Sequence, residues 1–384
     1  MSSNPKSADS AIQPQRPAPE LDWVNVLFLF GTPAFSFIFL AIYLKVETFN
    51  PAFIWLFLVF YIITGIAMTG GYHRLYSHRT YRASKALELF YLLFGAAAIQ
   101  NSVLVWADDH RRHHLHVDTD DDPYNAKRGL WFSHIAWVLY KDSYKERNIK
   151  NTPDLAKNPL VMWQHKYYWY LAVSMGFCLP TLIGWFMGSA LGGFIFGGIL
   201  RVVVVHQLIF FINSLAHYWG TQTYTDENTA RDNFFLAILT YGEGYHNFHH
   251  VFAADYRNGV RWFNWDPTKW FIHLMSNLGL AHELRRINEA IILRARLAME
   301  KKRFRSQAPD HFHTVSESLD NLQMRLVEIK QRIHILSNEY KAFKKQIDVG
   351  RNNKMDELRI KIRHAKNEFR LARAQWRVTI AKAS

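Results

Sequence analysis

Uncharged apolar stretches alternate with polar ones along the first 220 residues. Four segments are almost purely apolar, and only the last contains ionisable side chains, Arg201 and His206. They span residues 24–44, 51–72, 167–187 and 191–215. Each is near the roughly 20 residues that cross a bilayer core. The links inside each pair are short, which predicts two antiparallel helical hairpins. We therefore expect an all-α integral membrane protein with four transmembrane helices.

The charge distribution indicates how these helices are oriented. The net charge is +14, although mean hydropathy is only −0.14, so apolar and basic residues are segregated. The two hairpin links hold almost no Lys or Arg, whereas residues 73–166 and those after 216 hold most of them. By the positive-inside rule, both termini and the large loops face the cytosol. We expect a bacterial inner membrane rather than the endoplasmic reticulum.

The two ends of the chain have different compositions. Residues 1–21 are rich in Pro, Ser and Gln and predict a disordered tail without a secretory signal. Residues 285–384 predict a basic helical extension, because apolar residues recur there with 3-4 spacing in two blocks around a glycine. These are Leu319, Leu322, Leu326, Ile329, Ile333, Leu336 and Tyr340, then Met355, Leu358, Ile362, Ala365, Phe369, Ala372 and Trp376. This helical hairpin is either a solvated amphipathic pair or a docking arm for a partner or anionic lipid.

Three histidine clusters are the candidate chemistry. The motifs HRLYSH, HRRHH and HNFHH contain eight histidines, and NSLAH adds one after the fourth apolar segment. The nine residues are His73, His78, His110, His113, His114, His217, His246, His249 and His250. In the second and third motifs the spacing is i, i+3, i+4, which places the imidazoles on one face of a helix. Imidazoles gathered in this way predict a shared metal.

Nine imidazoles exceed what one ion binds, so two metals are the economical interpretation. Asp109 and Glu243 are candidates to accept hydrogen bonds from ligand rings. The acidic run Asp118, Asp120, Asp121 and Asp122 is instead expected to be a solvated loop. The single cysteine, Cys178, excludes a thiolate cluster or an internal disulfide.

Segment 86–105 is apolar but ends in Gln100, Asn101 and Ser102. If it crossed the membrane, His110 would lie on the opposite side from His73 and His246. It is therefore predicted to be a re-entrant or interfacial helix that borders an enclosed cavity.

The motifs HRLYSH, DHRRHH, NSLAH and GEGYHNFHH, with DPYNAKRGLWFSHIAW at 122–137, resemble the membrane-bound Δ9 fatty acyl desaturases of the stearoyl-CoA desaturase type. The resemblance implies a membrane domain at 22–284 in which four helices are capped by a cytosolic catalytic domain. It also implies two iron ions held by the nine histidines, with Asn213 reaching one of them through water. Positions near the acyl chain and its headgroup correspond to Gln100, Asn101, Trp106, Lys127 and Arg128.

The resemblance leaves the acyl carrier and the electron donor open. Asp108 and Tyr140 stand where animal acyl-CoA enzymes carry arginines, so acyl-CoA, acyl-lipid and acyl carrier protein are all candidate substrates. No cytochrome b5 domain is recognised in this chain. Electrons are therefore expected from a separate ferredoxin, flavoprotein reductase or cytochrome b5, and nucleic acid is not an expected partner.

The resemblance implies an oxygen-dependent enzyme that inserts a cis double bond into a long saturated chain. A membrane hydroxylase with the same histidine centre is the nearest alternative. A metal transporter is disfavoured, because Arg201 and His206 are the only clear polar candidates for a pathway through the apolar helices.

Overall fold

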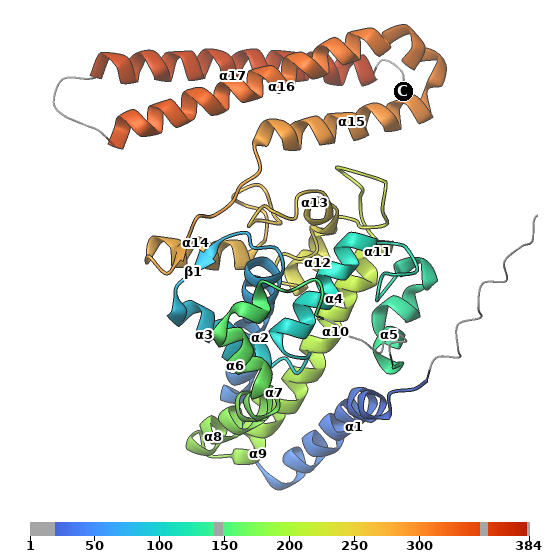
Figure 1. Cartoon of the computed structure of the whole chain (residues 1–384), viewed down its shortest axis with the longest axis vertical. Helices are drawn as coiled ribbons and strands as arrows, with labels where there is room; N and C mark the ends of the chain where they lie inside the picture. The colour runs from blue at the N-terminus through green and yellow to red at the C-terminus, as the bar shows by residue number, and fades with distance from the viewer. Residues whose placement is uncertain (1–19, 142–148, 346–351, 382–384) are drawn as a thin grey trace, which may run out of the picture.

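The computed structural model describes residues 20–141, 149–345 and 352–381. The predicted disordered tail, 1–21, therefore lies almost wholly outside the described residues. Within these ranges the chain is helical apart from a two-stranded antiparallel pair, β1 (Arg82–Ala83) and β2 (Ala281–His282), and isolated bridges. Figure 1 shows a helical bundle, a layer of shorter helices next to it, and a long helical arm beyond that layer.

Four helical stretches are long and apolar enough to cross a membrane, as predicted. They are Trp23–Val46, Ala52–Ser77, Tyr168–Phe186 and Ala190–Tyr218. The first is α1 (Trp23–Val46), and the second is α2 (Ala52–Ile66) continued by the π-helix η1 (Ala67–Ser77). The third comprises α7 (Tyr168–Val173), η5 (Ser174–Cys178) and α8 (Leu179–Phe186). The fourth comprises α9 (Ala190–Gly192), η6 (Gly193–Leu200), α10 (Arg201–Asn213) and α11 (Leu215–Tyr218).

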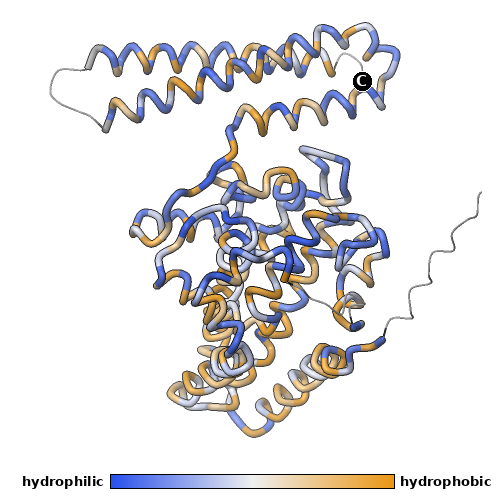
Figure 2. The backbone as a smooth tube through the Cα atoms, viewed as in Figure 1, coloured by the Kyte–Doolittle hydropathy of each residue, from blue (hydrophilic) through white to orange (hydrophobic). Residues whose placement is uncertain are grey.

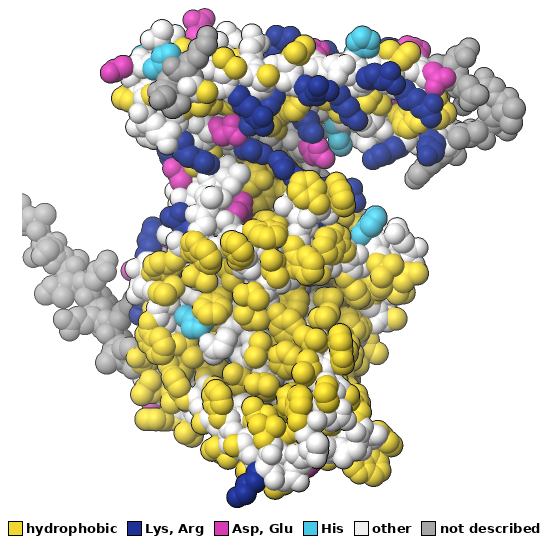
Figure 3. Space-filling view, turned by 180° about the vertical axis from the view of Figure 1, so that it is seen from behind, with side chains coloured by type: hydrophobic (Ala, Val, Ile, Leu, Met, Phe, Trp, Pro, Cys, Tyr) yellow, Lys and Arg dark blue, Asp and Glu magenta, His cyan; other side chains and the backbone are white. Residues whose placement is uncertain are grey.

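The outer surface of this bundle is apolar. Phe37, Trp55 and Phe186 are 76%, 69% and 75% exposed. Figures 2 and 3 show that hydrophobic residues dominate this end of the molecule and that charged residues gather at the other. A continuous apolar surface of this kind is stable in lipid and is rarely exposed by a soluble monomer.

Segment 86–105 forms two helices rather than the single helix predicted. α3 (Lys85–Ala96) and α4 (Val103–His116) have 12 and 14 residues, so neither can cross a bilayer. Between them Ile99 and Asn101 adopt left-handed backbone conformations, with φ of 56° and 72°. These conformations end α3 and turn the chain before Ser102 begins α4.

Arg201 and His206 bind the end of α3 from the fourth membrane helix. Arg201 is fully buried and donates to the carbonyl oxygens of Ala97 and Gly176 at 2.6 and 2.8 Å. The His206 Nε2 atom lies 2.6 Å from the carbonyl oxygen of Ala98. The carbonyls at a helix C-terminus lack intrahelical partners and carry partial negative charge. These two polar residues therefore hold the α3–α4 turn against the bundle.

The layer next to the bundle consists of short helices and loops. Its helices, besides α3 and α4, are η2 (Ala126–Arg128), η3 (Phe132–Ala136), α5 (Trp137–Leu139), η4 (Leu155–Lys157), α6 (Pro159–Lys166), α12 (Phe234–Leu239), α13 (His246–Val251) and α14 (Pro267–Asn277). The predicted domain boundary between residues 284 and 285 falls just before the arm and stays a prediction.

The arm consists of α15 (Glu289–Gln307), α16 (Pro309–Lys345) and α17 (Asn352–Ala381). The predicted helical hairpin is present as α16 and α17, although the expected glycine turn falls largely outside the described residues. α15 is a third helix that the heptad pattern did not predict. The three share a core that includes Leu297, Leu326 and the fully buried Trp376, so the arm is a folded body.

Candidate metal centre

The first histidine pair lies on the π-helix η1. The His78 N–H donates to the carbonyl oxygen of His73 at 3.1 Å, and this is the i to i+5 bond that defines a π-turn. The π-turn brings residues five apart onto one face, which an α-helix would not do. Gly71 allows this segment to pack closely, because a Cβ there would lie 2.5 Å from the Cβ of Tyr91 on α3.

The other ligand candidates come from α4, α11 and α13. On α4 and α13 each H-x-x-H-H run occupies one helical face, as predicted. His217 lies on α11, just beyond a break at Ser214 in the fourth membrane helix. All nine histidines come together at the ends of the second and fourth membrane helices, where they are joined by α4 and α13. Figure 1 shows α4, α11 and α13 in this part of the molecule.

The nine rings divide into two groups whose candidate ligand atoms lie within 4.8 Å of one another. The first group is His73, His78, His110, His114 and His249, and the second is His113, His217, His246 and His250. Both α4 and α13 contribute to both groups, because neighbouring positions on each helix point to either side. Two adjacent candidate metal sites that share two helices follow from this interleaving.

The spacing of the ring nitrogens suits metal ions. Neighbouring Nε2 atoms lie 2.8 Å apart for His78 and His110, 3.0 Å for His249 and His114, and 3.1 Å for His246 and His217. Imidazole nitrogens bound at about 2.1 Å to one ion lie about 3.0 to 3.4 Å apart in octahedral or tetrahedral geometry. The observed separations are therefore close to those of ligands that share an ion.

Two of the rings have a carboxylate beside Nδ1, on the side away from the cluster. This carboxylate determines which ring nitrogen carries the proton. The Nδ1 atom of His73 lies 3.0 Å from Glu243, and that of His113 lies 2.8 Å from Asp122. A neutral imidazole that donates Nδ1–H to a carboxylate presents an unprotonated Nε2 to the cluster. Such lone pairs repel one another at 3 Å unless a cation lies between them, so this donor set fits a metal.

Two further rings have neutral partners. The His217 Nδ1 atom lies 2.8 Å from the Thr229 hydroxyl, which donates to Asp118 at 2.6 Å. The His110 Nδ1 atom lies 3.3 Å from the Tyr124 hydroxyl. Thr229 and Tyr124 were not identified from the sequence, because nothing in their local pattern places them beside a histidine.

The expectation of a solvated acidic loop was wrong for two of its four residues. Asp118 and Asp122 are buried and fix the second metal group, whereas Asp120 and Asp121 are exposed. The turn after α4 folds back under His113, and this long-range placement has no signal in a run of aspartates. Glu243 contacts a ligand ring as predicted, whereas Asp109 lies 3.9 Å from Arg112.

Burial favours the neutral form of six rings. It lowers the pKa of six histidines well below the usual value, and repulsion from neighbouring histidines lowers it further. These are His78, His110, His114, His246, His249 and His250. Although burial alone would raise it, His73 and Arg74 hold the pKa of Glu243 below its usual value. Neutral imidazole is the protonation state that binds metal.

Among the predicted substrate residues, Trp106 contacts this centre. Trp106 stacks on His110 with ring centroids 5.0 Å apart. Gln100 and Asn101 form the α3–α4 turn, and the Gln100 Nε2 atom is buried without a hydrogen-bond partner among the described residues. Lys127 and Arg128 are exposed on η2. Their contacts with substrate stay a prediction.

The remaining predicted positions have their own contacts. Asn213 ends α10, four residues before His217, and its contact with metal through water stays a prediction. Asp108 accepts a hydrogen bond from the Asn151 N–H at 2.8 Å, and Tyr140 is partly exposed. Several histidines outside the clusters have polar partners; His165, for example, lies 2.7 Å from the Ser102 hydroxyl.

Comparison with known proteins agrees with this site. The fatty acid desaturase family model matches residues 50–275. Acyl-CoA desaturase 1 of Saccharomyces cerevisiae is 44% identical over 285 residues, which are 74% of this chain and 55% of that protein. The sn-2 palmitoyl-lipid 9-desaturase of Nostoc sp. is 37% identical over 289 residues, which are 71% of this chain and 94% of that protein.

Animal proteins are similar too. The stearoyl-CoA desaturase of Sus scrofa is 36% identical over 285 residues, which are 72% of this chain and 78% of that protein. The chain spans about half the length of the two fungal relatives that it matches. The matched family region includes all nine histidines that the fold brings together. The chain belongs to the fatty acid desaturase family.

Proposed function

We propose that this protein is an oxygen-dependent fatty acyl desaturase that introduces a cis double bond, at C9, into a long saturated acyl chain. The observation that carries this proposal is the convergence of nine histidines into two groups beside the membrane helices. The relatives support the reaction, because those cited above are named desaturases and two of those names specify position 9 or a stearoyl substrate.

Two iron ions are the proposed metals, one for each group of histidines. Imidazole suits ferrous iron, and the ligand sets of five and four rings leave room for a water-bridged Asn213 at the second. With O₂, bound iron supplies an oxidant strong enough to remove two hydrogens from neighbouring methylene groups. Glu243 and Asp122 fix the ring orientation, and the apolar packing around Trp106 excludes water.

The α3–α4 turn is the proposed bend of the acyl site. Arg201 and His206 hold this turn in place, and Gln100 and Trp106 lie on the side that leads to His110. Lys127 and Arg128 are proposed to contact the headgroup from the exposed loop. The acyl carrier is proposed to be coenzyme A, with acyl-lipid or acyl carrier protein as alternatives, because both acyl-CoA and acyl-lipid enzymes are among the relatives.

The reaction requires an electron donor. Removing two hydrogens from the substrate supplies two electrons, whereas reducing O₂ to two waters consumes four. Two electrons and two protons must therefore enter at each turnover, and we propose a separate ferredoxin, flavoprotein reductase or cytochrome b5 as their source. We propose that the centre lies on the cytosolic side of a bacterial inner membrane; the basic loops support this orientation.

Fatty acid analysis of a host that lacks unsaturated fatty acids tests this function. Expression of the protein should yield a cis-monounsaturated acid with the double bond at C9. Replacing any ligand histidine, for example His249→Ala, should abolish the product while the protein still inserts in the membrane. His364→Ala, an exposed position on the arm, should retain activity. A hydroxylated product would favour the alternative, and product in several ligand variants would refute the proposal.

A further inference from the structure

The net positive charge of this chain resides in its C-terminal arm. Residues 285–384 contain 24 Lys and Arg and 11 Asp and Glu, a net charge of +13 out of the total of +14. The rest of the chain is therefore nearly neutral. Figure 3 shows Lys and Arg side chains gathered along the arm, including its edge next to the rest of the protein.

Six basic residues of α17 form one continuous stripe. Arg359, Arg363, Lys366, Arg370, Arg373 and Arg377 follow one another with 4-3-4-3-4 spacing. This spacing aligns side chains on one helical face over about 27 Å. Arg373 pairs with Glu300 of α15 at 2.8 Å, so the stripe lies on the side of α17 that faces α15. The other five are exposed.

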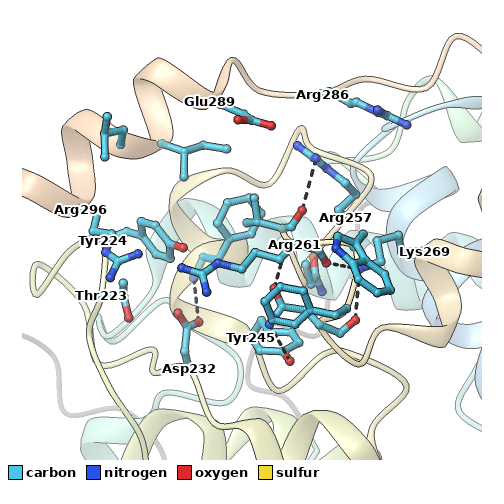
Figure 4. Close-up of a pocket in the computed structure, with 18 of the residues that line it drawn as sticks. Thr223, Tyr224, Asp232, Tyr245, Arg257, Arg261, Lys269, Arg286, Glu289 and Arg296 are labelled. Atoms are coloured by element: carbon cyan, nitrogen blue, oxygen red, sulfur yellow. Dashed lines mark hydrogen bonds between the residues drawn. The ribbon is translucent and has the colours of Figure 1, made fainter. Parts of the chain in front are cut away.

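A cavity of about 990 Å³ lies beside this stripe, between the arm and the layer that holds the histidines (Figure 4). Its basic residues outnumber its two acidic ones, Asp232 and Glu289. The basic residues are Arg257, Arg261, Lys269, Arg286, Arg296 and Lys330. Phe369, which lies between Lys366 and Arg370 on α17, lines the cavity as well. The stripe and the cavity are thus one basic surface.

Aromatic side chains lie at the same cavity. Trp262 is 83% exposed, and Phe263 and Trp270 are also exposed and line the cavity. Exposed Trp, Tyr and Arg are the residue types enriched where proteins dock on one another. The chemistry of this surface, cationic around an aromatic centre, suits an acidic protein.

The inner wall of the cavity includes α13, which carries three of the nine candidate ligands. Tyr245 and Phe248 line the cavity, and they directly neighbour His246 and His249 in sequence. Phe248 packs with Ile292 of α15 on the side of α13 away from the metal groups. A molecule bound in the cavity is therefore separated from the candidate metal centre by one six-residue helix, which is a short route for electrons.

We infer that the α17 stripe and this cavity form the docking surface for an acidic one-electron carrier protein, which delivers the two electrons of each turnover in two steps. The inference rests on the proposed function, since a desaturase that reduces O₂ to water needs such a donor. Figure 1 shows the arm at the end of the molecule opposite to the membrane-spanning bundle, so the stripe is remote from the lipid that surrounds those helices. Charge complementarity thus favours a protein over a lipid surface.

Charge reversal on the stripe tests the inference in the full-length, iron-loaded protein. The triple variant Arg363→Glu/Lys366→Glu/Arg370→Glu is compared with wild type, using a reduced plant-type [2Fe–2S] ferredoxin as the donor. At low salt, kcat/KM for ferredoxin and the ferredoxin Kd should each worsen by about 10-fold or more. The dependence on salt between about 50 and 300 mM should flatten. Metal content and single-turnover product with dithionite should not change.

Two single variants test whether the position of the charge on α17 matters, or only the change in total charge. Lys366→Glu lies on the stripe, whereas Lys361→Glu makes the same change at an exposed position off the stripe. Only Lys366→Glu should raise the ferredoxin Kd by several-fold. Equal effects from both variants, or unchanged ferredoxin kinetics in the triple variant, would overturn the inference. So would a triple variant that loses binding to phosphatidylglycerol vesicles but keeps its ferredoxin kinetics.

The two proposals fail in different ways. If the wild-type protein gives no unsaturated product even with dithionite, the proposed function fails. The ferredoxin Kd, which requires no turnover, still tests the docking surface in that case. If dithionite supports product formation but ferredoxin neither binds nor supports turnover at any salt concentration, the docking surface alone fails.

Discussion

The carboxylate of Glu243 lies 3.0 Å from the Nδ1 atom of His73 and accepts a hydrogen bond from Arg74 at 2.9 Å. All three side chains are buried, and Arg74 also contacts Asp266, through Nη2 at 3.0 Å and Nη1 at 3.2 Å. Arg74 therefore holds one carboxylate oxygen of Glu243, and this orients the other oxygen toward His73, a candidate ligand. Orientation of the first metal group thus depends on an ion-pair network that contains no ligand itself.

Neutralising this carboxylate should weaken the first metal site. Glu243→Gln keeps the shape and one hydrogen bond to His73 but loses the charge that raises ring basicity. Iron affinity should fall by about 10- to 100-fold, as measured by competition with a chelator. Glu283→Gln, which changes an exposed carboxylate 3.1 Å from Arg82, should leave affinity unchanged. An unchanged affinity in Glu243→Gln would contradict the assigned role.

The link from Asp118 through Thr229 to His217 should control the second site separately. Thr229→Val keeps the volume but removes the hydroxyl that joins the two side chains. The second iron should bind about 10-fold more weakly, whereas the first group should be unaffected. Iron titration should resolve the two sites, and Thr229→Ser should restore normal binding. Equal weakening of both sites would argue for a general loss of stability instead.

A side chain at position 71 should disrupt the π-helix. The Cβ of Gly71→Ala would lie 2.5 Å from the Cβ of Tyr91, too close for a side-chain rotation to relieve. Overpacking of this kind destabilises by about 1 to 3 kcal/mol, so the melting temperature should fall. Gly31→Ala on α1 is the control, because its Cβ would meet Phe35 at an ordinary 3.6 Å. Similar melting of both variants would show that the close contact relaxes freely.

The guanidinium of Arg201 should be needed for the α3–α4 turn. Arg201→Met leaves the carbonyls of Ala97 and Gly176 unpaired, at about 1 to 3 kcal/mol each. Thermal melting should show a clear loss of stability. Arg201→Lys should be intermediate, since an ammonium cannot span carbonyls that the planar guanidinium reaches together. If Lys restored full stability, a buried charge alone would be sufficient.

The sequence predicted those features that depend on the spacing of residues along a single helix. The apolar segments, the shared helical face of His110, His113 and His114, and the α16–α17 hairpin all follow from spacing along one element. The His73–His78 pair shows where this reasoning ends. Its i, i+5 spacing fits no α-helical face, and a π-helix explains it only once the packing of Gly71 against α3 is known.

Features that depend on distant partners were not accessible from sequence. Asp122 looked solvated because burial is set by how the following loop folds under His113, not by neighbouring aspartates. The role of Arg201 was not predicted either, because its carbonyl partners, Ala97 and Gly176, lie 104 and 25 residues away in sequence. The heptad pattern did not predict α15. This helix packs on α13 with one face and on α16 with another, so its apolar residues do not form a single heptad stripe.

The contact between Ile292 and Phe248 has a consequence for how this protein can be divided. A helix as short as α13 has little intrinsic stability, so its rigidity comes from what covers it. Ile292 of α15 provides part of that cover, although α15 belongs by sequence to the basic extension. We therefore expect a truncated protein that ends before α15 to keep all nine histidines but to hold the three on α13 less rigidly.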